Sequence, residues 1–150
     1  IYELKHRPES KLLQMLADDL DSAARAGLIV CPRLRALADA FWPGALTVVA
    51  DASDGSTIGL RIPDHPLLHA LLPLLDGPLA ATSANRSGDA AATTAESAVL
   101  GLEGLPDLLV DGGPVVGTGQ PSTVVSICGG DLVVLRPGPI GETALRQAMG

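Results

Sequence analysis

A β-hairpin signal near the end of the chain restricts its possible folds, because strands and helices alternate along the rest. Residues 123–127 and 132–135 have the β-branched and apolar composition of strands, and Gly129-Gly130 between them favours a tight turn. A hairpin requires antiparallel pairing, whereas strands separated by helices favour parallel pairing. The sequence therefore predicts an α/β fold in which helices flank a twisted, mixed parallel and antiparallel sheet.

The other elements are predicted from hydrophobic periodicity and from glycine and proline breaks. Further strands are expected at residues 1–5, 45–50, 57–62, 79–82 and 108–110. Helices are expected at residues 10–26, 32–41, 66–75, 95–100 and 141–149. The glycine-containing residues 112–119 are predicted to form a flexible loop, which makes them a candidate lid over a ligand.

Length and composition argue against several classes of protein. The 150 residues suit a single domain at residues 1–150, and no apolar run reaches the roughly 18 residues of a membrane span, so no membrane partner is expected. A net charge of −7 and 2% aromatic residues disfavour nucleic-acid binding through overall charge or base stacking, although a local basic cleft stays open. Cys31 and Cys128 match no metal pattern and are expected to be reduced thiols. No secretory signal is visible, which favours the cytoplasm.

Two short polar clusters interrupt this apolar chain. Lys5 and Arg7 would share one face of an extended segment, where a guanidinium fork and an ammonium suit phosphate oxygens. Ser83 and Asn85 follow an expected buried strand, and the backbone N–H groups of such a loop can cradle phosphate. The alternatives are a solvated strand end for the first cluster and an ordinary turn for the second.

Three further polar residues lie in or beside expected strands. Arg61 sits in an apolar strand and therefore needs a partner, which is either a substrate carboxylate or an acid such as Asp64. Ser122 and Arg136 would lie near one end of the hairpin if its strands pair. His65 and His69 lack a third ligand, so a helix surface is favoured over a metal site.

Six motifs in order make the chain resemble the YrdC-like family, the L-threonylcarbamoyladenylate synthases. They are Lys5-x-Arg7-Pro8, Phe41-Trp42-Pro43-Gly44-Ala45-Leu46-Thr47, Gly59-Leu60-Arg61-Ile62-Pro63-Asp64-His65, Ala81-Thr82-Ser83-Ala84-Asn85-x-Ser87-Gly88, Pro121-Ser122-Thr123-Val124-Val125 and Leu135-Arg136-Pro137-Gly138. Each motif is modest alone, but their order is specific and spans nearly the whole chain. The resemblance implies a YrdC-like fold with a concave, positively charged cleft.

The resemblance also implies a reaction and its partners. Members make threonylcarbamoyl-AMP and pyrophosphate from L-threonine, bicarbonate and ATP, and Mg²⁺ is expected to bind through the phosphates rather than in a protein metal site. The product serves the synthesis of N6-threonylcarbamoyladenosine at position 37 of tRNA. The implied partners are therefore tRNA threonylcarbamoyl-transfer proteins, with possible tRNA or double-stranded RNA binding.

Position by position, the resemblance assigns residues to three roles. The family's signature catalytic tetrad corresponds to Lys5, Arg7, Ser83 and Asn85. Its nucleotide-contacting positions correspond to Arg7, Lys11, Thr57, Ala81, Ser83 and Arg136. Its threonine-contacting positions correspond to Arg61 and Ser122. The two polar clusters are thereby expected to meet in one site.

The sequence also departs from the family pattern. Members normally carry a Pro-Thr-x-Thr-x-Tyr-Gly-Leu segment ahead of the Lys-x-Arg motif, so we expect such a segment upstream of Ile1 and an N-terminally truncated chain here. Leu16 stands near the position where many members place a histidine. The alternatives to a synthase are a non-catalytic paralogue that binds nucleotide or RNA, and a related carbamoyl-transfer domain of a larger maturation enzyme.

Overall fold

The structure is a computed structural model that describes residues 1–11, 13–115 and 120–150. Its described residues divide into two compact units. The small unit comprises Ile1–Leu13 and Thr82–Gly119, and the sheet unit comprises Gln14–Ala81 and Gln120–Gly150. A single domain at residues 1–150 stays a prediction.

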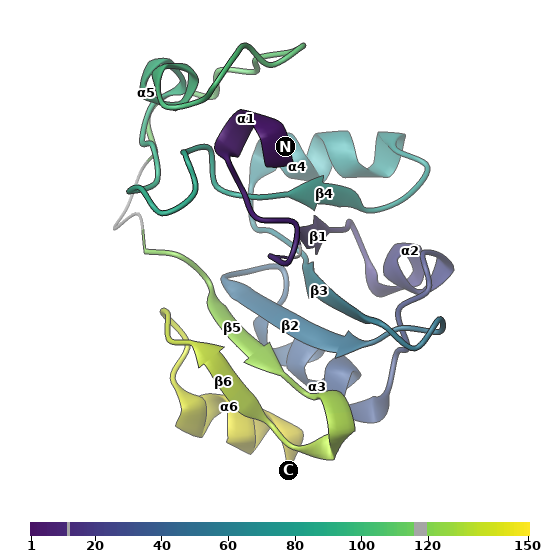
Figure 1. The fold of residues 1–150 in the computed structure, drawn as a ribbon. Helices are drawn as coiled ribbons and strands as arrows, with labels where there is room; N and C mark the ends of the chain where they lie inside the picture. Colours follow the sequence, from purple (N-terminus) through teal and green to yellow (C-terminus); the bar gives the residue numbers. More distant parts are fainter. Residues whose placement is uncertain (12, 116–119) are drawn as a thin grey trace. The chain divides into compact units, whose positions relative to one another are not determined.

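The described strands of the sheet unit form one six-stranded mixed sheet (Figure 1). Its strands are β1 (Gln14–Leu16), β2 (Leu46–Asp51), β3 (Thr57–Arg61), β4 (Leu79–Ala81), β5 (Thr123–Ser126) and β6 (Val133–Arg136). The order across the sheet is β4-β1-β3-β2-β5-β6. The β1/β3 and β2/β5 pairs are parallel, and the other pairs are antiparallel. The predicted fold class is thus confirmed.

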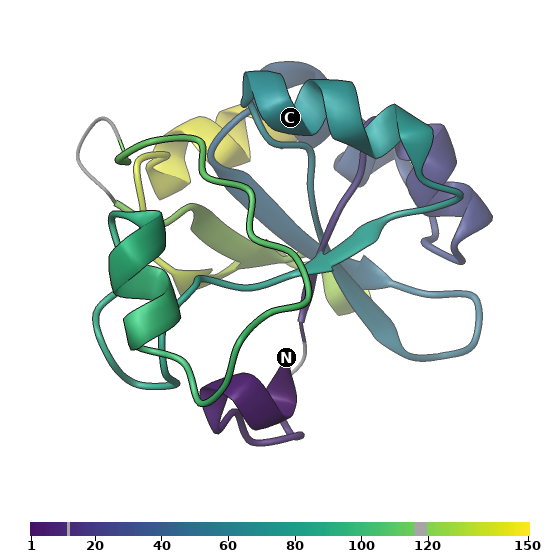
Figure 2. The same cartoon turned by 90° about the horizontal axis from the view of Figure 1, so that it is seen from above.

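Helices of the sheet unit cover one face of this sheet. They include α2 (Leu20–Arg25), α3 (Pro32–Phe41), α4 (Pro66–Leu71) with a 3-10 turn at Leu72–Leu74, and α6 (Glu142–Met149). Figure 2 shows α2, α3 and α6 on the same side of the strands. The helix predicted at residues 32–41 is confirmed, and it begins with Pro32, whose fixed φ suits the first helical position.

The core lies between those helices and one face of the sheet. Leu46, Val48 and Ala50 alternate along β2 and are buried against that side. Leu34 and Leu37 of α3 and Leu145 of α6 complete the layer, and all three side chains are fully buried. Because side chains alternate along a strand, the residues between the buried ones face the opposite side. That opposite face carries most of the polar groups described below.

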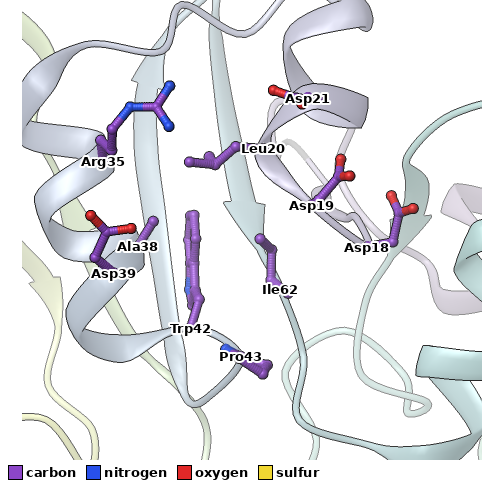
Figure 3. Close-up of a pocket in the computed structure, with 10 residues that line it drawn as sticks. All are labelled: Asp18, Asp19, Leu20, Asp21, Arg35, Ala38, Asp39, Trp42, Pro43 and Ile62. Atoms are coloured by element: carbon purple, nitrogen blue, oxygen red, sulfur yellow. The ribbon is translucent and has the colours of Figure 1, made fainter.

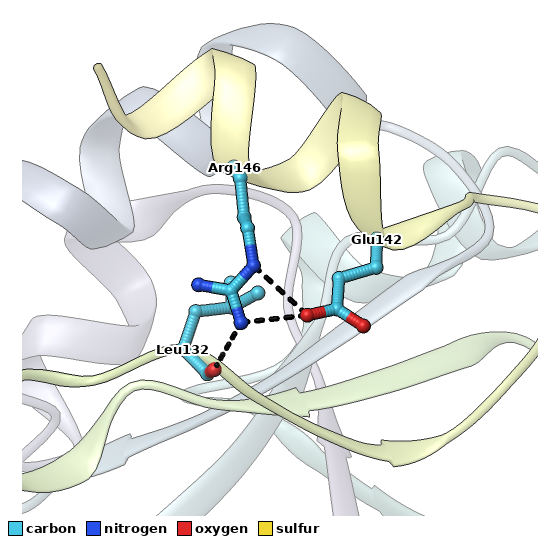
Figure 4. A network of polar contacts seen from close by, with 3 residues as sticks. All are labelled: Leu132, Glu142 and Arg146. Atoms are coloured by element: carbon cyan, nitrogen blue, oxygen red, sulfur yellow. Dashed lines mark hydrogen bonds and ion pairs between the residues drawn. The ribbon is translucent and has the colours of Figure 1, made fainter.

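Arg146 of α6 forms an ion pair within its own helix and a backbone contact outside it (Figure 4). Arg146 donates two hydrogen bonds to Glu142 Oε1, at 2.8 Å from Nε and 2.6 Å from Nη2. Its Nη2 also donates to the carbonyl oxygen of Leu132 at 3.3 Å, just ahead of β6. The arginine therefore ties the helix to the strand that carries Arg136.

The small unit contains two short helices, and backbone hydrogen bonds join the first of them to residues outside the second. The helices are α1 (Tyr2–Lys5) and α5 (Ala95–Leu100), and α5 starts in a capping box formed by Thr94 and Ser97. The carbonyl of Leu4 accepts from the amide of Glu103 at 2.9 Å, and that of Lys5 accepts from the amide of Ser87 at 2.8 Å. The two sequence-distant segments of this unit are thus connected through their main chains.

Three sequence predictions of secondary structure are wrong. Residues 1–5 form a helical turn rather than a strand. The helix expected at residues 10–26 is replaced by β1 and α2, and residue 12 lies outside the described residues. The apolar residues at 108–110 form no strand and are exposed, so their composition alone misled the prediction. Of the candidate lid at 112–119, residues 116–119 lie outside the described part, and the lid stays a prediction.

Candidate active site

The two polar clusters of the small unit meet at Lys5. Its Nζ donates to the carbonyl oxygens of Ser83 and Asn85 and lies 3.4 Å from Asn85 Oδ1. The amide Nδ2 of Asn85 in turn donates to the carbonyls of Arg86 and Asp89, each at 2.8 Å. The structure therefore brings three of the four tetrad residues together, while their chemical role stays a prediction.

Lys5 is enclosed by the loop that it binds. The residue is 4% exposed, and its ammonium has three N–H groups for three neighbouring oxygens. Burial, and secondarily the charge of Arg7, lower the pKa of Lys5 below its usual value. In this arrangement Lys5 holds the Ser83–Asn85 loop in place, and the exposed Ser83 side chain is left for other partners.

Arg7 and Lys11 follow α1 in a tight turn rather than in an extended segment. His6 adopts a left-handed conformation at φ 48° and ψ 43°, and the Arg7 amide bonds back to the carbonyl of Tyr2 at 2.9 Å. The expected extended face shared by Lys5 and Arg7 is therefore wrong. Arg7 Nε donates to the carbonyl of Lys11 at 2.9 Å, so these two predicted nucleotide contacts are neighbours. The Lys11 side chain is exposed.

In the sheet unit, strand register places the predicted residues on the face opposite the core. Thr47 lies between the buried Leu46 and Val48 and therefore faces the other way. Val48 of β2 pairs with Leu60 of β3, and the two strands are antiparallel. The residue before Val48, Thr47, therefore lies beside the residue after Leu60, Arg61. The same alternation and the β1/β3, β1/β4 and β5/β6 registers place further side chains on this face. They are Gln14, Thr57, Ala81 and Arg136.

Arg61 makes a backbone contact rather than an ion pair with an acid of the chain, which was one of its two expected partners. Its Nε donates to the carbonyl oxygen of Gly44 at 2.8 Å. Gly44 is fixed in turn, because its amide donates to the carbonyl of Ile62 at 2.9 Å and a Cβ there would lie 2.4 Å from the carbonyl oxygen of Phe41. Within the described residues Arg61 forms no ion pair with Asp64 or another acid. Partial burial, and secondarily Arg136, lower the pKa of Arg61.

Arg136 and Ser122 meet at the end of the hairpin, as predicted. Arg136 donates to the Ser122 carbonyl from Nε at 3.2 Å and from Nη2 at 2.9 Å, and Nη2 also lies 3.1 Å from Ser122 Oγ. Gly138 presses on the same segment, since a Cβ there would lie 2.4 Å from the amide nitrogen of Thr123. The described part of the chain offers neither Arg61 nor Arg136 an acidic partner.

Sequence reasoning missed two polar residues of this face. Thr47 Oγ1 lies 2.9 Å from Ser122 Oγ and donates to Gln14 Oε1 at 3.2 Å. Thr47 belongs to a family motif and alternates with buried residues in β2, which is the signal that could have singled it out. Gln14 was hidden by the helix expected at residues 10–26.

Comparisons with known proteins agree with these motifs and this fold. The model of the Sua5/YciO/YrdC family, described as "Telomere recombination", matches residues 1–138. The chain belongs to this family. A Bacillus subtilis protein named threonylcarbamoyl-AMP synthase is 36% identical, with 100% of this chain and 46% of that protein covered. A Schizosaccharomyces pombe protein of the same name is 30% identical, at coverages of 100% and 44%.

Solved structures of the Sua5/YciO/YrdC family share the fold. Pyrococcus abyssi Sua5 complexed with L-threonine superposes with a TM-score of 0.87 at 29% identity, covering 99% of this chain and 46% of that one. E. coli YciO, at 24% identity and a TM-score of 0.80, supports the fold alone, with coverages of 97% and 74%. The chain spans about half the length of the curated relatives that it matches.

A cavity in the sheet unit of this Sua5/YciO/YrdC-family chain is lined by other residues than the predicted ones. It has a volume of about 520 Å³ and lies beside α2 and α3, with Trp42, Leu20 and Ile62 among its lining (Figure 3). Four carboxylates and one guanidinium also line it, from Asp18, Asp19, Asp21, Asp39 and Arg35. None of the predicted site residues lines this cavity. Because those carboxylates repel phosphate, the cavity is unsuited to ATP.

The described residues contain no group of three metal-ligating side chains. His69 Nε2 lies 2.8 Å from the carbonyl oxygen of Pro63, and His65 is the N-cap residue of α4 without a side-chain capping hydrogen bond. The residues assigned to the nucleotide carry cationic or neutral groups, so they fit the phosphates themselves rather than a magnesium ion. Among the described helices, none is long and apolar enough to cross a membrane.

Proposed function

We propose that this chain is the YrdC-like domain of an L-threonylcarbamoyladenylate synthase. Such an enzyme makes threonylcarbamoyl-AMP and pyrophosphate from L-threonine, bicarbonate and ATP. The observation that carries the proposal is the pair Arg61 and Arg136, whose guanidinium groups share one sheet face without a carboxylate partner among the described residues. Two cations without counter-ions suit a site for anionic substrates. The names of the relatives support the same activity.

The residues divide into roles within each unit. In the sheet unit, Arg61 binds the carboxylate of L-threonine and Ser122 binds its polar groups. The nucleotide contacts of this unit are Thr57, Ala81 and Arg136. In the small unit, Arg7, Lys11 and Ser83 contact the nucleotide, while Lys5 and Asn85 hold the loop that presents Ser83.

The chemistry needs orientation and charge neutralisation more than proton transfer. The threonine amine forms an N–C bond to the carbon of bicarbonate, one C–O bond breaks, and the oxygen leaves as water, which gives the carbamate. A carbamate oxygen then forms a bond to the α-phosphorus of ATP, the bond to the bridging oxygen breaks, and pyrophosphate leaves with that electron pair. Guanidinium groups stabilise the negative charge during this displacement. Mg²⁺ bound through the phosphates would neutralise further charge.

The product has a defined further use in this proposal. Threonylcarbamoyl-AMP is a mixed anhydride, and tRNA threonylcarbamoyl-transfer proteins would pass its acyl group to adenosine 37 of tRNA in the cytoplasm. Direct binding of tRNA or double-stranded RNA by this chain is a further part of the proposal. The net charge of −7 places any such contact on a local basic surface.

The proposal is tested by measuring pyrophosphate release by the full protein, with the adenylate product identified by mass spectrometry. We expect product only when ATP, L-threonine and bicarbonate are all present, and omission of each is the control. Pyrophosphate release at the same rate with and without L-threonine would overturn the proposal. Binding of nucleotide or tRNA without turnover would identify the non-catalytic alternative instead.

A further inference from the structure

A chain of four hydrogen-bonding groups crosses the polar face of the sheet unit. Arg136 Nη2 lies 3.1 Å from Ser122 Oγ, which lies 2.9 Å from Thr47 Oγ1, which lies 3.2 Å from Gln14 Oε1. The two hydroxyl-bearing residues in the middle are 4% and 3% exposed, so bulk water does not compete for their protons. This series of contacts therefore connects β1, β2 and β6 through Ser122, which directly precedes β5.

The ends of this chain set the direction of every proton within it. A guanidinium can only donate, and an amide oxygen can only accept. Thr47 gives its single proton to Gln14 Oε1 and must therefore accept from Ser122. Ser122 in turn gives its single proton to Thr47. Its oxygen accepts from Arg136 and has one acceptor position left.

We propose that Thr47 is a positioning residue that, with Gln14, keeps the Ser122 hydroxyl as an acceptor towards the ligand. Resting on the proposed function, this makes the partner of Ser122 an N–H or O–H group of L-threonine, its amine or its side-chain hydroxyl. The threonine carboxylate, which can only accept, is excluded from Ser122 and goes to Arg61. Thr47 thus contributes both to the orientation of the bound amino acid and to the selection of L-threonine.

The first test is the dissociation constant of L-threonine, measured by calorimetry on the full protein. Thr47→Val keeps the shape of the side chain but removes the hydroxyl oxygen that accepts from Ser122. The Ser122 hydroxyl can then donate its proton to another group. We expect about tenfold weaker L-threonine binding, in line with one lost hydrogen bond, and unchanged ATP binding. Thr47→Ser keeps the hydroxyl and should restore the affinity to within about twofold of the original protein.

Thr123→Val is the matched control. Thr123 is also buried and lies on the neighbouring strand, but its hydroxyl bonds to the backbone of Ile140 on the core side. The Thr123→Val substitution should lower the melting temperature of the protein and leave its affinity for L-threonine unchanged. A folded Thr47→Val protein that binds L-threonine as tightly as the original chain would overturn the inference.

A second ligand distinguishes the two possible donors. L-2-aminobutyrate has the amine but lacks the hydroxyl of L-threonine. If the amine is the donor, Thr47→Val weakens binding of both ligands by the same factor. If the hydroxyl is the donor, it weakens binding of L-threonine alone. A loss for L-2-aminobutyrate but none for L-threonine would contradict both assignments and overturn the inference.

A crystal structure of Thr47→Val gives a readout that needs no ligand. The Ser122 Oγ should leave its place beside residue 47, and an unchanged Ser122 rotamer overturns the positioning role. The failure of the proposed function is separate from this outcome. If the original protein binds no L-threonine in the presence of ATP and bicarbonate, the synthase proposal fails, while the rotamer still decides whether Thr47 positions Ser122.

Discussion

Lys5 of the small unit and the arginines Arg61 and Arg136 of the sheet unit are used in opposite ways. Lys5 is buried, and each of its three N–H groups has a protein oxygen close by. Towards the described residues Arg61 donates from Nε alone, and Arg136 donates from Nε and Nη2. Since a guanidinium has five N–H groups, both arginines keep donors for another molecule. Lys5 therefore serves the fold of its loop, whereas the arginines are available to a ligand.

Lys5→Met should give the largest effect, because it leaves the buried oxygens of the Ser83–Asn85 loop without a donor. We expect the free energy of unfolding to fall by about 3 kcal/mol, measured by urea denaturation. Amide exchange at Ser87, which donates to the carbonyl of Lys5, should speed up as well. Lys11→Met alters an exposed lysine of the same unit and is the control. Equal stability of the two variants would remove the contrast between Lys5 and the arginines.

Arg61→Met should affect ligand binding more than stability. Loss of a charged hydrogen bond costs about 1.5–3 kcal/mol, which corresponds to roughly 10- to 150-fold weaker L-threonine binding. Calorimetry on the folded variant measures this loss, and Arg61→Lys tests whether charge alone suffices. If Lys5→Met weakened L-threonine binding as much as Arg61→Met while the loop stayed intact, the contrast between Lys5 and Arg61 would be refuted.

The lowered pKa of Lys5 gives a pH dependence with a definite sign. The folded state loses the Lys5 proton at a lower pH than the unfolded state, in which Lys5 has the ordinary lysine pKa of 10.5. Between those two values the unfolded chain binds more protons, so the contribution of Lys5 to stability rises with pH. We expect the difference in unfolding free energy between the original protein and Lys5→Met to grow as pH rises towards 10.5. A difference that shrinks over this interval would contradict the prediction.

Glu142→Gln should give the smallest effect. Glu142 and Arg146 form an ion pair four residues apart, and both side chains are more than half exposed. Exposed pairs of this kind contribute about 0.5 kcal/mol, which salt screens. Thermal unfolding at low and high salt measures the change. A loss of several kcal/mol would show that a surface pair can match the buried Lys5 cluster, against the comparison drawn above.

Much of the sheet unit was predictable because its signals are local. Pro32 marks the start of α3, and Gly129-Gly130 marks the hairpin, where both glycines have positive φ angles. The meeting of Ser122 and Arg136 followed from that hairpin alone. Arg61 was also singled out correctly as a strand residue in need of a partner, although its backbone contact with Gly44 depends on the fold of a distant segment.

The wrong helix at residues 10–26 has a different cause. Leu13 and Leu16 suggested a helix, but Gln14–Leu16 pairs with both β3 and β4, and this tertiary pairing overrides the local preference. Asp19 then starts α2 by accepting a hydrogen bond from the amide of Ser22 at 2.6 Å. Gln14 and Thr47 became candidates only once the strand register was known. A polar network across three strands leaves no spacing signature in a single sequence.

The parallel pairing of β2 with β5 also affects how the chain folds. Leu46 pairs with Thr123, and the hydroxyls of Thr47 and Ser122 that meet there are 75 residues apart in sequence. During synthesis, β2 can pair with β3 as soon as β3 has been made. The other edge of β2 can pair with β5 only after the second segment of the small unit, Thr82–Gly119, has been made. Closing so long a loop is entropically costly and slows folding. The polar face is therefore completed late, and an assay of ligand binding during refolding would report the last stage of sheet assembly.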